Sequence, residues 1–122
     1  MNLKLRSVAG KGVAEEERLV IDVLRECELG EYAVFHTGFS VETGNVDIGV
    51  SNTFWFPNKE VRNGDLVVLY TKRGRSSEKA LENGRKAYFF YWEKTGPLWS
   101  ADDKAAVLLH APEWEAKGAG SL

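Results

Sequence analysis

The chain has few of the residues that form disulfides or bind structural metals, which commonly stabilise small domains. Its 122 residues include one cysteine, Cys27, and two histidines. An internal disulfide therefore cannot form, and nitrogen and sulfur ligands alone cannot complete a closed zinc site. The acidic clusters lie far apart in the sequence and lack the spacing of a metal-binding loop. We therefore expect a fold without a structural metal or a cofactor.

Long apolar segments are also missing. The densest apolar run, 87–92, is six residues long before Glu93 interrupts it. A membrane-spanning helix needs roughly 18 such residues or more. The first residues alternate basic and apolar side chains and do not form the two blocks of a signal peptide. These absences predict a cytoplasmic protein with no membrane partner, or else a domain of a longer protein.

Neither sign of charge dominates the chain. It carries 16 basic and 18 acidic side chains, a formal charge of -2, which disfavours polyanion binding over the whole surface. Residues 59–94 nevertheless hold nine basic and five acidic side chains. Six of these cations lie on the predicted loop 71–86: Lys72, Arg73, Arg75, Lys79, Arg85 and Lys86. They are candidate contacts to nucleic-acid phosphates, and the competing interpretation is a solvated loop without function.

The chain does have abundant apolar and aromatic side chains. Apolar residues make up 43% of the sequence and aromatic residues 11%, which is enough for one compact core at this length. We therefore predict a single domain over residues 1–116. The last residues, 117–122, are mostly small and predict a flexible tail.

The spacing of the apolar residues favours strands. The N-terminal leucines alternate with basic residues and predict an edge strand that ends near 10–12. In the next segment, Leu19, Ile21 and Val23 would share one face of a strand. A helix over 13–27 fits a second, helical spacing, and this choice stays open. The β-rich run 32–36 follows a turn, so we expect it to form a hairpin with 19–24.

Further short apolar segments follow, separated by glycines and by two Asn-Gly pairs that favour tight turns. The segments that are typical of strands are 39–41, 46–50, 54–56, 66–70, 87–92 and 105–109. Turns every eight to twelve residues predict an all-β fold, an immunoglobulin-like β-sandwich of about seven to nine short strands.

The order of several segments also suggests a family. They are Phe54-Trp55-Phe56-Pro57, the run 61–70, the aromatic run ending at Trp92, Leu98-Trp99-Ser100, and the run 105–109. Together they resemble the lamin tail domain over residues 31–115. Two features depart from that family: Asp47-Ile48-Gly49 lacks the Trp of its usual Gly-Trp pair, and the loop 71–86 is long and charged. The resemblance implies an immunoglobulin-like sandwich that acts as a binding or scaffolding module, with no catalytic residues.

Cys27 and His36 form the strongest catalytic hypothesis, a thiolate beside an imidazolium. A lone cysteine is more often a small buried hydrophobic residue, and His110 fits a surface position at a strand end. We therefore expect a protein that is not an enzyme, and the sequence does not name a specific activity.

The 14 Phe, Trp and Tyr side chains exceed what one small core needs. Strand alternation puts Trp55 opposite Phe54 and Phe56. We therefore predict that Trp55, or one face of 88–92, forms a surface for a protein partner. A homodimer through this surface is compatible with the pattern. A different hypothesis starts from Gly64-Asp65, which leads into 66–70 as in PUA-like β-barrel readers of RNA or modified bases. That hypothesis requires an aromatic-walled ligand cavity.

Overall fold

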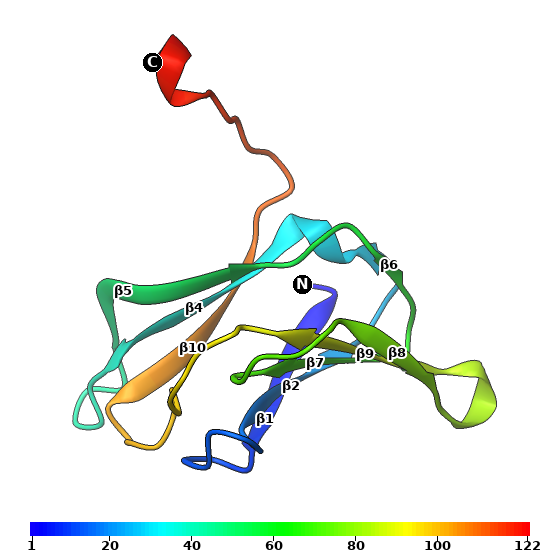
Figure 1. Ribbon diagram of the computed structural model, residues 1–122, viewed down its shortest axis with the longest axis horizontal. Helices are drawn as coiled ribbons and strands as arrows, with labels where there is room; N and C mark the ends of the chain where they lie inside the picture. Colours follow the sequence, from blue (N-terminus) through cyan, green and yellow to red (C-terminus); the bar gives the residue numbers. More distant parts are fainter.

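The computed structural model describes residues 1–122, the side chain of Ile48 excepted, and the fold is all-β (Figure 1). The strands are β1 (Leu3–Ala9), β2 (Arg18–Val23), β3 (Cys27–Glu28), β4 (Tyr32–Phe39), β5 (Val46–Trp55), β6 (Glu60–Val61), β7 (Leu66–Tyr70), β8 (Ser77–Ala80), β9 (Lys86–Tyr91) and β10 (Lys104–His110). Three short 3-10 turns accompany them: η1 (Leu29–Glu31), η2 (Glu82–Gly84) and η3 (Ala119–Ser121). The structure has ten strands, whereas the sequence predicted seven to nine. Two of the ten, β3 and β6, are only two residues long.

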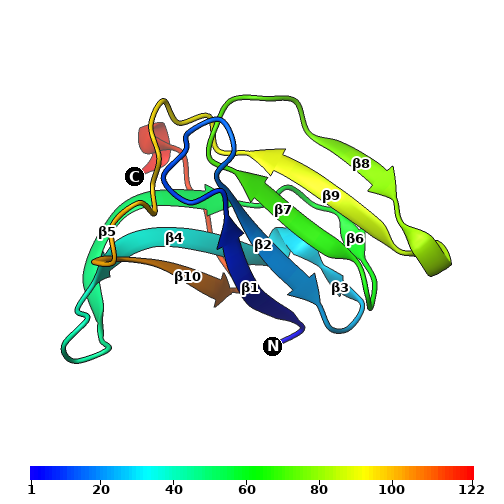
Figure 2. The same ribbon diagram turned by 90° about the horizontal axis from the view of Figure 1, so that it is seen from below.

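The strands form two layers of sheet (Figures 1 and 2). The larger sheet has five strands in the order β1-β2-β7-β9-β8, and the smaller has three in the order β10-β4-β5. β3 and β6 pair as a separate two-stranded sheet. β1 and β8 are the edges of the larger sheet, and β10 and β5 are the edges of the smaller one. Both sheets are therefore open, and neither closes into a barrel.

Residues 18–23 form a strand, which settles the choice between helix and strand for this segment. Leu19, Ile21 and Val23 are buried on one face, as the alternation predicted. The predicted hairpin with 32–36 is wrong. β2 pairs with β1 and β7, whereas β4 pairs with β10 and β5 in the other sheet. The intervening chain pairs through β3 with β6 and turns at η1, so it crosses from one layer to the other.

The charged segment 71–86, predicted as one long loop, contains β8 and η2. β7 and β9 run parallel, and β8 pairs antiparallel with β9. Parallel strands cannot be joined by a tight turn. Segment 71–86 therefore leads back from the end of β7 to the start of β9, and on the way β8 pairs with the outer edge of β9. Its Asn83-Gly84 pair has φ angles of 59° and 74°, which explains why an Asn-Gly pair stands at this turn.

The core lies between the two layers. Buried side chains of β2, β7 and β9 meet buried side chains of β4 in one cluster. Aromatic rings complete it: Phe56 packs edge-on against Phe54 and Phe90, with ring centroids 5.2 and 5.3 Å apart. Trp92 packs against Phe54 at 6.0 Å. Part of the aromatic surplus is therefore used inside the fold, in the edge-to-face geometry that aromatic pairs prefer.

One residue, Leu98, fixes the connection between β9 and β10 to both layers through its backbone. The backbone N–H of Leu98 donates to Glu17 Oε1 at 2.6 Å, and its carbonyl lies 2.7 Å from His36 Nε2. The side-chain amide of Asn52 donates to His36 Nδ1 at 3.1 Å, so in a neutral imidazole the proton lies on Nε2 and is donated to Leu98. Glu17 immediately precedes β2 and His36 lies on β4. The contact therefore ties the two sheets together through this connection.

Candidate functional site

The outer face of the β10-β4-β5 sheet carries mostly apolar side chains. The register places Phe35 opposite Val107 and Thr53, and places Ala33 opposite Leu109 and Trp55. Directly opposed residues project from the same face of a sheet, and this face points away from the core cluster. A solvated strand face usually carries polar residues at such positions. The composition of this face therefore marks it as a candidate interface.

Trp55 is both exposed and held in place. Its side chain is 52% exposed, whereas Phe56 beside it is 2% exposed, in agreement with the predicted alternation. The indole Nε1–H of Trp55 donates to the carbonyl of Gly30 on η1 at 2.7 Å. This bond fixes the orientation of the ring before any partner binds, which lowers the entropy lost on binding.

A second tryptophan, Trp114, packs perpendicular to Trp55, and the two rings form what we call the tryptophan corner. Trp114, in the segment after β10, is 62% exposed and meets Trp55 with planes at 90° and ring centroids 4.7 Å apart. A pocket of about 230 Å³ lies beside the corner. Its lining residues are Glu31, Tyr32, Ala33, Phe35, Thr53, Trp55, Leu109, Ala111 and Trp114. Four of these nine are aromatic and one is charged, so the pocket is apolar with a single carboxylate.

Acidic side chains dominate the surroundings of this pocket. The Glu31 carboxylate lies 3.0 Å from His110 Nε2, and the His110 ring stacks on Tyr32. Glu113 and Glu115 flank Trp114 in the chain and are exposed. Residues 27–58, which include η1, β4 and β5, hold four acidic and no basic side chains. Carboxylates therefore outnumber cations at the end of the sheet where the pocket lies, while Lys104 begins β10 at the opposite end.

The six predicted basic residues fall into two groups. Lys72, Arg73 and Arg75 follow the end of β7, whereas Lys79, Arg85 and Lys86 lie on β8 and at the start of β9. Lys86 begins β9 and Tyr91, beside the end of β7, finishes it. At the usual rise of a strand, about 16–17 Å separates these ends. The cations therefore do not form the single patch on one loop that the sequence suggested.

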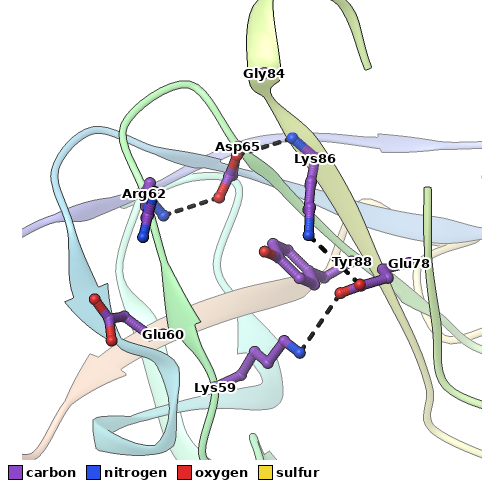
Figure 3. Close-up of a pocket in the computed structure, with 8 residues that line it drawn as sticks. All are labelled: Lys59, Glu60, Arg62, Asp65, Glu78, Gly84, Lys86 and Tyr88. Atoms are coloured by element: carbon purple, nitrogen blue, oxygen red, sulfur yellow. Dashed lines mark hydrogen bonds and ion pairs between the residues drawn. The ribbon is translucent and has the colours of Figure 1, made fainter. Parts of the chain in front are cut away.

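Lys86, of the second basic group, lines a pocket of about 340 Å³ (Figure 3). Glu78 lies between the Nζ atoms of Lys59 and Lys86, at 3.5 and 3.6 Å. The buried carboxylate of Asp65 accepts the backbone N–H groups of Arg62 and Lys86 at 2.8 and 2.9 Å. Three basic and three acidic side chains line this pocket. Their charges balance, which makes the pocket a poor cradle for phosphate.

The first basic group borders two stacked tyrosines, one on β7 and one on β9. The rings of Tyr70 and Tyr91 are parallel within 10°, with centroids 5.2 Å apart. The charged ends of Arg18 and Lys72 lie 5.8 and 5.2 Å from the centre of the Tyr70 ring, within the range of a cation–π contact. Gly74 passes so close to Tyr91 that an added Cβ would overlap the ring. The basic loop is therefore packed directly against the stack.

Cys27 and His36 do not form a nucleophilic pair. Both ring nitrogens of His36 are engaged, one with Asn52 and the other with Leu98. Burial raises the pKa of the Cys27 thiol, and the neighbouring carboxylates raise it further against one opposing hydrogen bond. The thiol is therefore protonated at neutral pH and lacks the thiolate that nucleophilic chemistry needs.

Among the residues that the structure describes, no three His, Cys, Asp or Glu side chains are placed to hold a metal ion. The described chain also has no helix of the length and apolar character needed to cross a membrane. Comparisons with models of protein families, with curated proteins and with solved structures give no match.

The sequence pattern identified Trp55 but missed the residues that complete both aromatic sites. Trp114 lies outside every predicted strand, between two glutamates, and that polar context was the available signal for an exposed tryptophan. The stack of Tyr70 on Tyr91 had no comparable signal. It depends on the parallel register that pairs these two residues, and strand periodicity does not reveal pairing partners.

Proposed function

We propose that the protein is a non-enzymatic interaction module of the immunoglobulin-like, lamin-tail-like type, and that a protein partner docks on the outer face of the β10-β4-β5 sheet. The observation that carries the proposal is the corner formed by Trp55 and Trp114. Both side chains are more than half exposed, so each offers a large apolar area to a partner. Tryptophan is enriched among the residues that contribute most to binding at protein interfaces.

Two further observations support this assignment. The core between two open layers of sheet is the arrangement expected of a sandwich. Strands also occupy several of the segments on which the lamin-tail resemblance rests, including β7 and β10, whereas Leu98-Trp99-Ser100 lies in the connection between β9 and β10. The PUA-like alternative requires a closed barrel around a ligand cavity. The open sheets and the side-chain cluster between them lend that alternative no support.

The test is a selection of peptides from a random displayed library on the immobilised full chain, followed by affinity measurements by fluorescence anisotropy. We expect the double variant Trp55→Ala and Trp114→Ala to bind the selected peptides at least about tenfold more weakly, as loss of a hot-spot tryptophan implies. Val41→Ala removes an equally exposed apolar side chain, 66% exposed, from the loop between β4 and β5. This control should bind as the wild type does.

Selected peptides that bind the double variant with unchanged affinity would contradict the proposal, as would a selection that enriches no sequence. Sedimentation equilibrium adds one distinction. A dimer that dissociates in the double variant would identify a second copy of the chain as the partner on this face.

The stacked tyrosines favour a second candidate function, binding of single-stranded nucleic acid. Bases stack on aromatic rings while nearby cations contact phosphates, and Tyr70 has both Arg18 and Lys72 over its ring. Anisotropy with a labelled 15-nucleotide strand tests this candidate. Neutralising Arg73 and Arg75 should weaken binding and reduce the salt dependence by about two phosphate contacts. Lys79→Ala, in the other basic group, is the matched control, and no binding at low salt would rule the candidate out.

A further inference from the structure

We infer that the pocket beside Trp55 and Trp114 accepts the ammonium group of a lysine side chain, free or N-methylated, from the docked protein partner. This inference rests on the proposed interaction function and names the chemical group that the surface selects.

The geometry of the corner suits a cation. Two indole rings meet at 90° with centroids 4.7 Å apart, and Phe35 adds a third aromatic side chain to the lining. The face of an aromatic ring is the negative part of its quadrupole, so converging rings attract organic ammonium ions. The indole N–H of Trp55 is already used by the Gly30 carbonyl at 2.7 Å. The N–H edge of that ring is therefore engaged with the backbone. The perpendicular contact with Trp114 covers part of the ring surface, and the aromatic surface that stays exposed at the corner remains for a ligand.

The charges point the same way. Glu31 is the one charged residue in the lining, and residues 27–58 contain no basic side chain. A phosphate or carboxylate would meet charge of its own sign here, and an uncharged aliphatic group would gain nothing from Glu31. A cation gains from both the carboxylate and the rings.

The apolar lining also ranks the cations. Moving an ion out of water into an apolar pocket is costly, and N-methylation spreads the charge over a larger group that holds water less tightly. The trimethylated form should therefore bind most tightly and unmodified lysine less tightly. His110 already pairs with Glu31 at 3.0 Å, so a bound ammonium group shares this carboxylate with His110.

The probe is N-acetyl-Nε-trimethyllysine amide, titrated into the full chain while the indole N–H signals of Trp55 and Trp114 are followed by NMR. The matched ligand control is the isostere in which carbon replaces the quaternary nitrogen, which has the same shape without the charge. We expect the charged probe to bind about tenfold more tightly than the isostere, with the N-acetyl-lysine amide between the two.

Three protein variants locate the site. Trp114→Ala should weaken binding of the charged probe about tenfold, and Trp114→Phe, which keeps an aromatic face, should restore part of the loss. Glu31→Gln should weaken it about threefold to tenfold. Glu82→Gln, at the distant turn η2, removes the same charge and should have no effect. Trp114 is 62% exposed, so its replacement leaves the core unaltered.

Equal affinity for the charged probe and its neutral isostere would overturn the inference and leave an unselective apolar pocket, and unchanged indole signals would overturn it as well. Selected peptides that depend on Trp55 and Trp114 but bind equally well with every lysine replaced would refute the lysine inference while the interaction function stands. Charged-probe binding combined with peptides that ignore both tryptophans would refute the interaction function and the protein source of the cation together.

Discussion

Glu17 is a fully buried carboxylate without a cationic partner, so its replacement should change the free energy of unfolding more than replacement of an exposed glutamate. Its side chain is 0% exposed. Oε1 accepts the Thr71 hydroxyl at 2.7 Å and the Leu98 N–H at 2.6 Å, and Oε2 accepts the N–H groups of Gly12 and Trp99 at 3.0 and 3.2 Å. Four donors from three separate loops therefore converge on one carboxylate.

We predict that Glu17→Gln destabilises the fold by about 3 kcal/mol. The amide keeps one oxygen acceptor but turns its NH2 group toward two donors that then lose their partner, and each hydrogen bond to a charged group contributes about 1.5–3 kcal/mol. For a chain of this size, about 3 kcal/mol corresponds to a fall of about 12 °C in melting temperature. Thermal and urea unfolding followed by tryptophan fluorescence measure both quantities.

Glu16→Gln is the matched control, because Glu16 is the exposed neighbour of Glu17. Exposed substitutions of this kind usually change the free energy of unfolding by less than about 0.5 kcal/mol. A loss of less than about 1 kcal/mol in Glu17→Gln, or a loss equal to that of the control, would refute the account of the four converging donors.

The same contacts predict a pH dependence. Burial raises the pKa of Glu17, but the four hydrogen bonds together outweigh burial and hold the pKa below its ordinary value of 4.5. A carboxyl whose folded-state pKa is depressed contributes stability that is present above the unfolded-state pKa and is lost as the pH falls through the folded-state pKa. The stability difference between the wild type and Glu17→Gln should therefore shrink in acid below pH 4.5. A difference that stays constant from pH 7 to pH 3 would contradict this.

Two further predictions concern residues outside the proposed interface. Because burial raises the pKa of Cys27, iodoacetamide should alkylate the native protein at neutral pH far more slowly than the urea-unfolded chain. Equal rates would mean that the thiol is activated or freely exposed. Gly74→Ala should destabilise the fold by about 1–3 kcal/mol because the new methyl group would overlap the Tyr91 ring. Gly96→Ala, where nothing lies within 4 Å of the added group, is its control in urea unfolding, and equal stability of the two variants would show that the ring moves aside freely.

The sequence was a good guide to where strands lie and a poor guide to which strands pair. The run 66–70 became β7 with the same bounds, because a continuous apolar run between turn residues has few other structures available. The partner of β2 was misjudged because alternation defines which face of a strand is buried and leaves its neighbours open. Those neighbours depend on crossovers between layers, such as the one through β3 and η1.

The sequence likewise predicted only part of the candidate site. Alternation alone placed Trp55 on the side opposite Phe56, and the structure shows that separation. The contact of Trp55 with Trp114 joins β5 to the segment after β10, residues 59 positions apart in the chain. No local pattern encodes such a contact. The division of the basic residues into two groups likewise follows from β8, a strand formed from charged residues that looked like loop.

The near-neutral total charge of the chain conceals two segments of opposite charge that contribute to different sheets. Residues 59–94, with a net charge of +4, supply β7, β8 and β9 of the larger sheet, whereas residues 27–58, with four acidic and no basic side chains, supply β4 and β5 of the smaller sheet. Each layer also carries an aromatic cluster: the tyrosine stack has Arg18 and Lys72 beside it, and the tryptophan corner has Glu31 beside it. Because exposed charges steer association over about a Debye length, the proposed protein partner would be drawn to the tryptophan corner by a cationic segment, and a nucleic acid would be drawn to the tyrosine stack. A cationic protein segment and an anionic partner would thus be sorted to opposite sides of the same small domain.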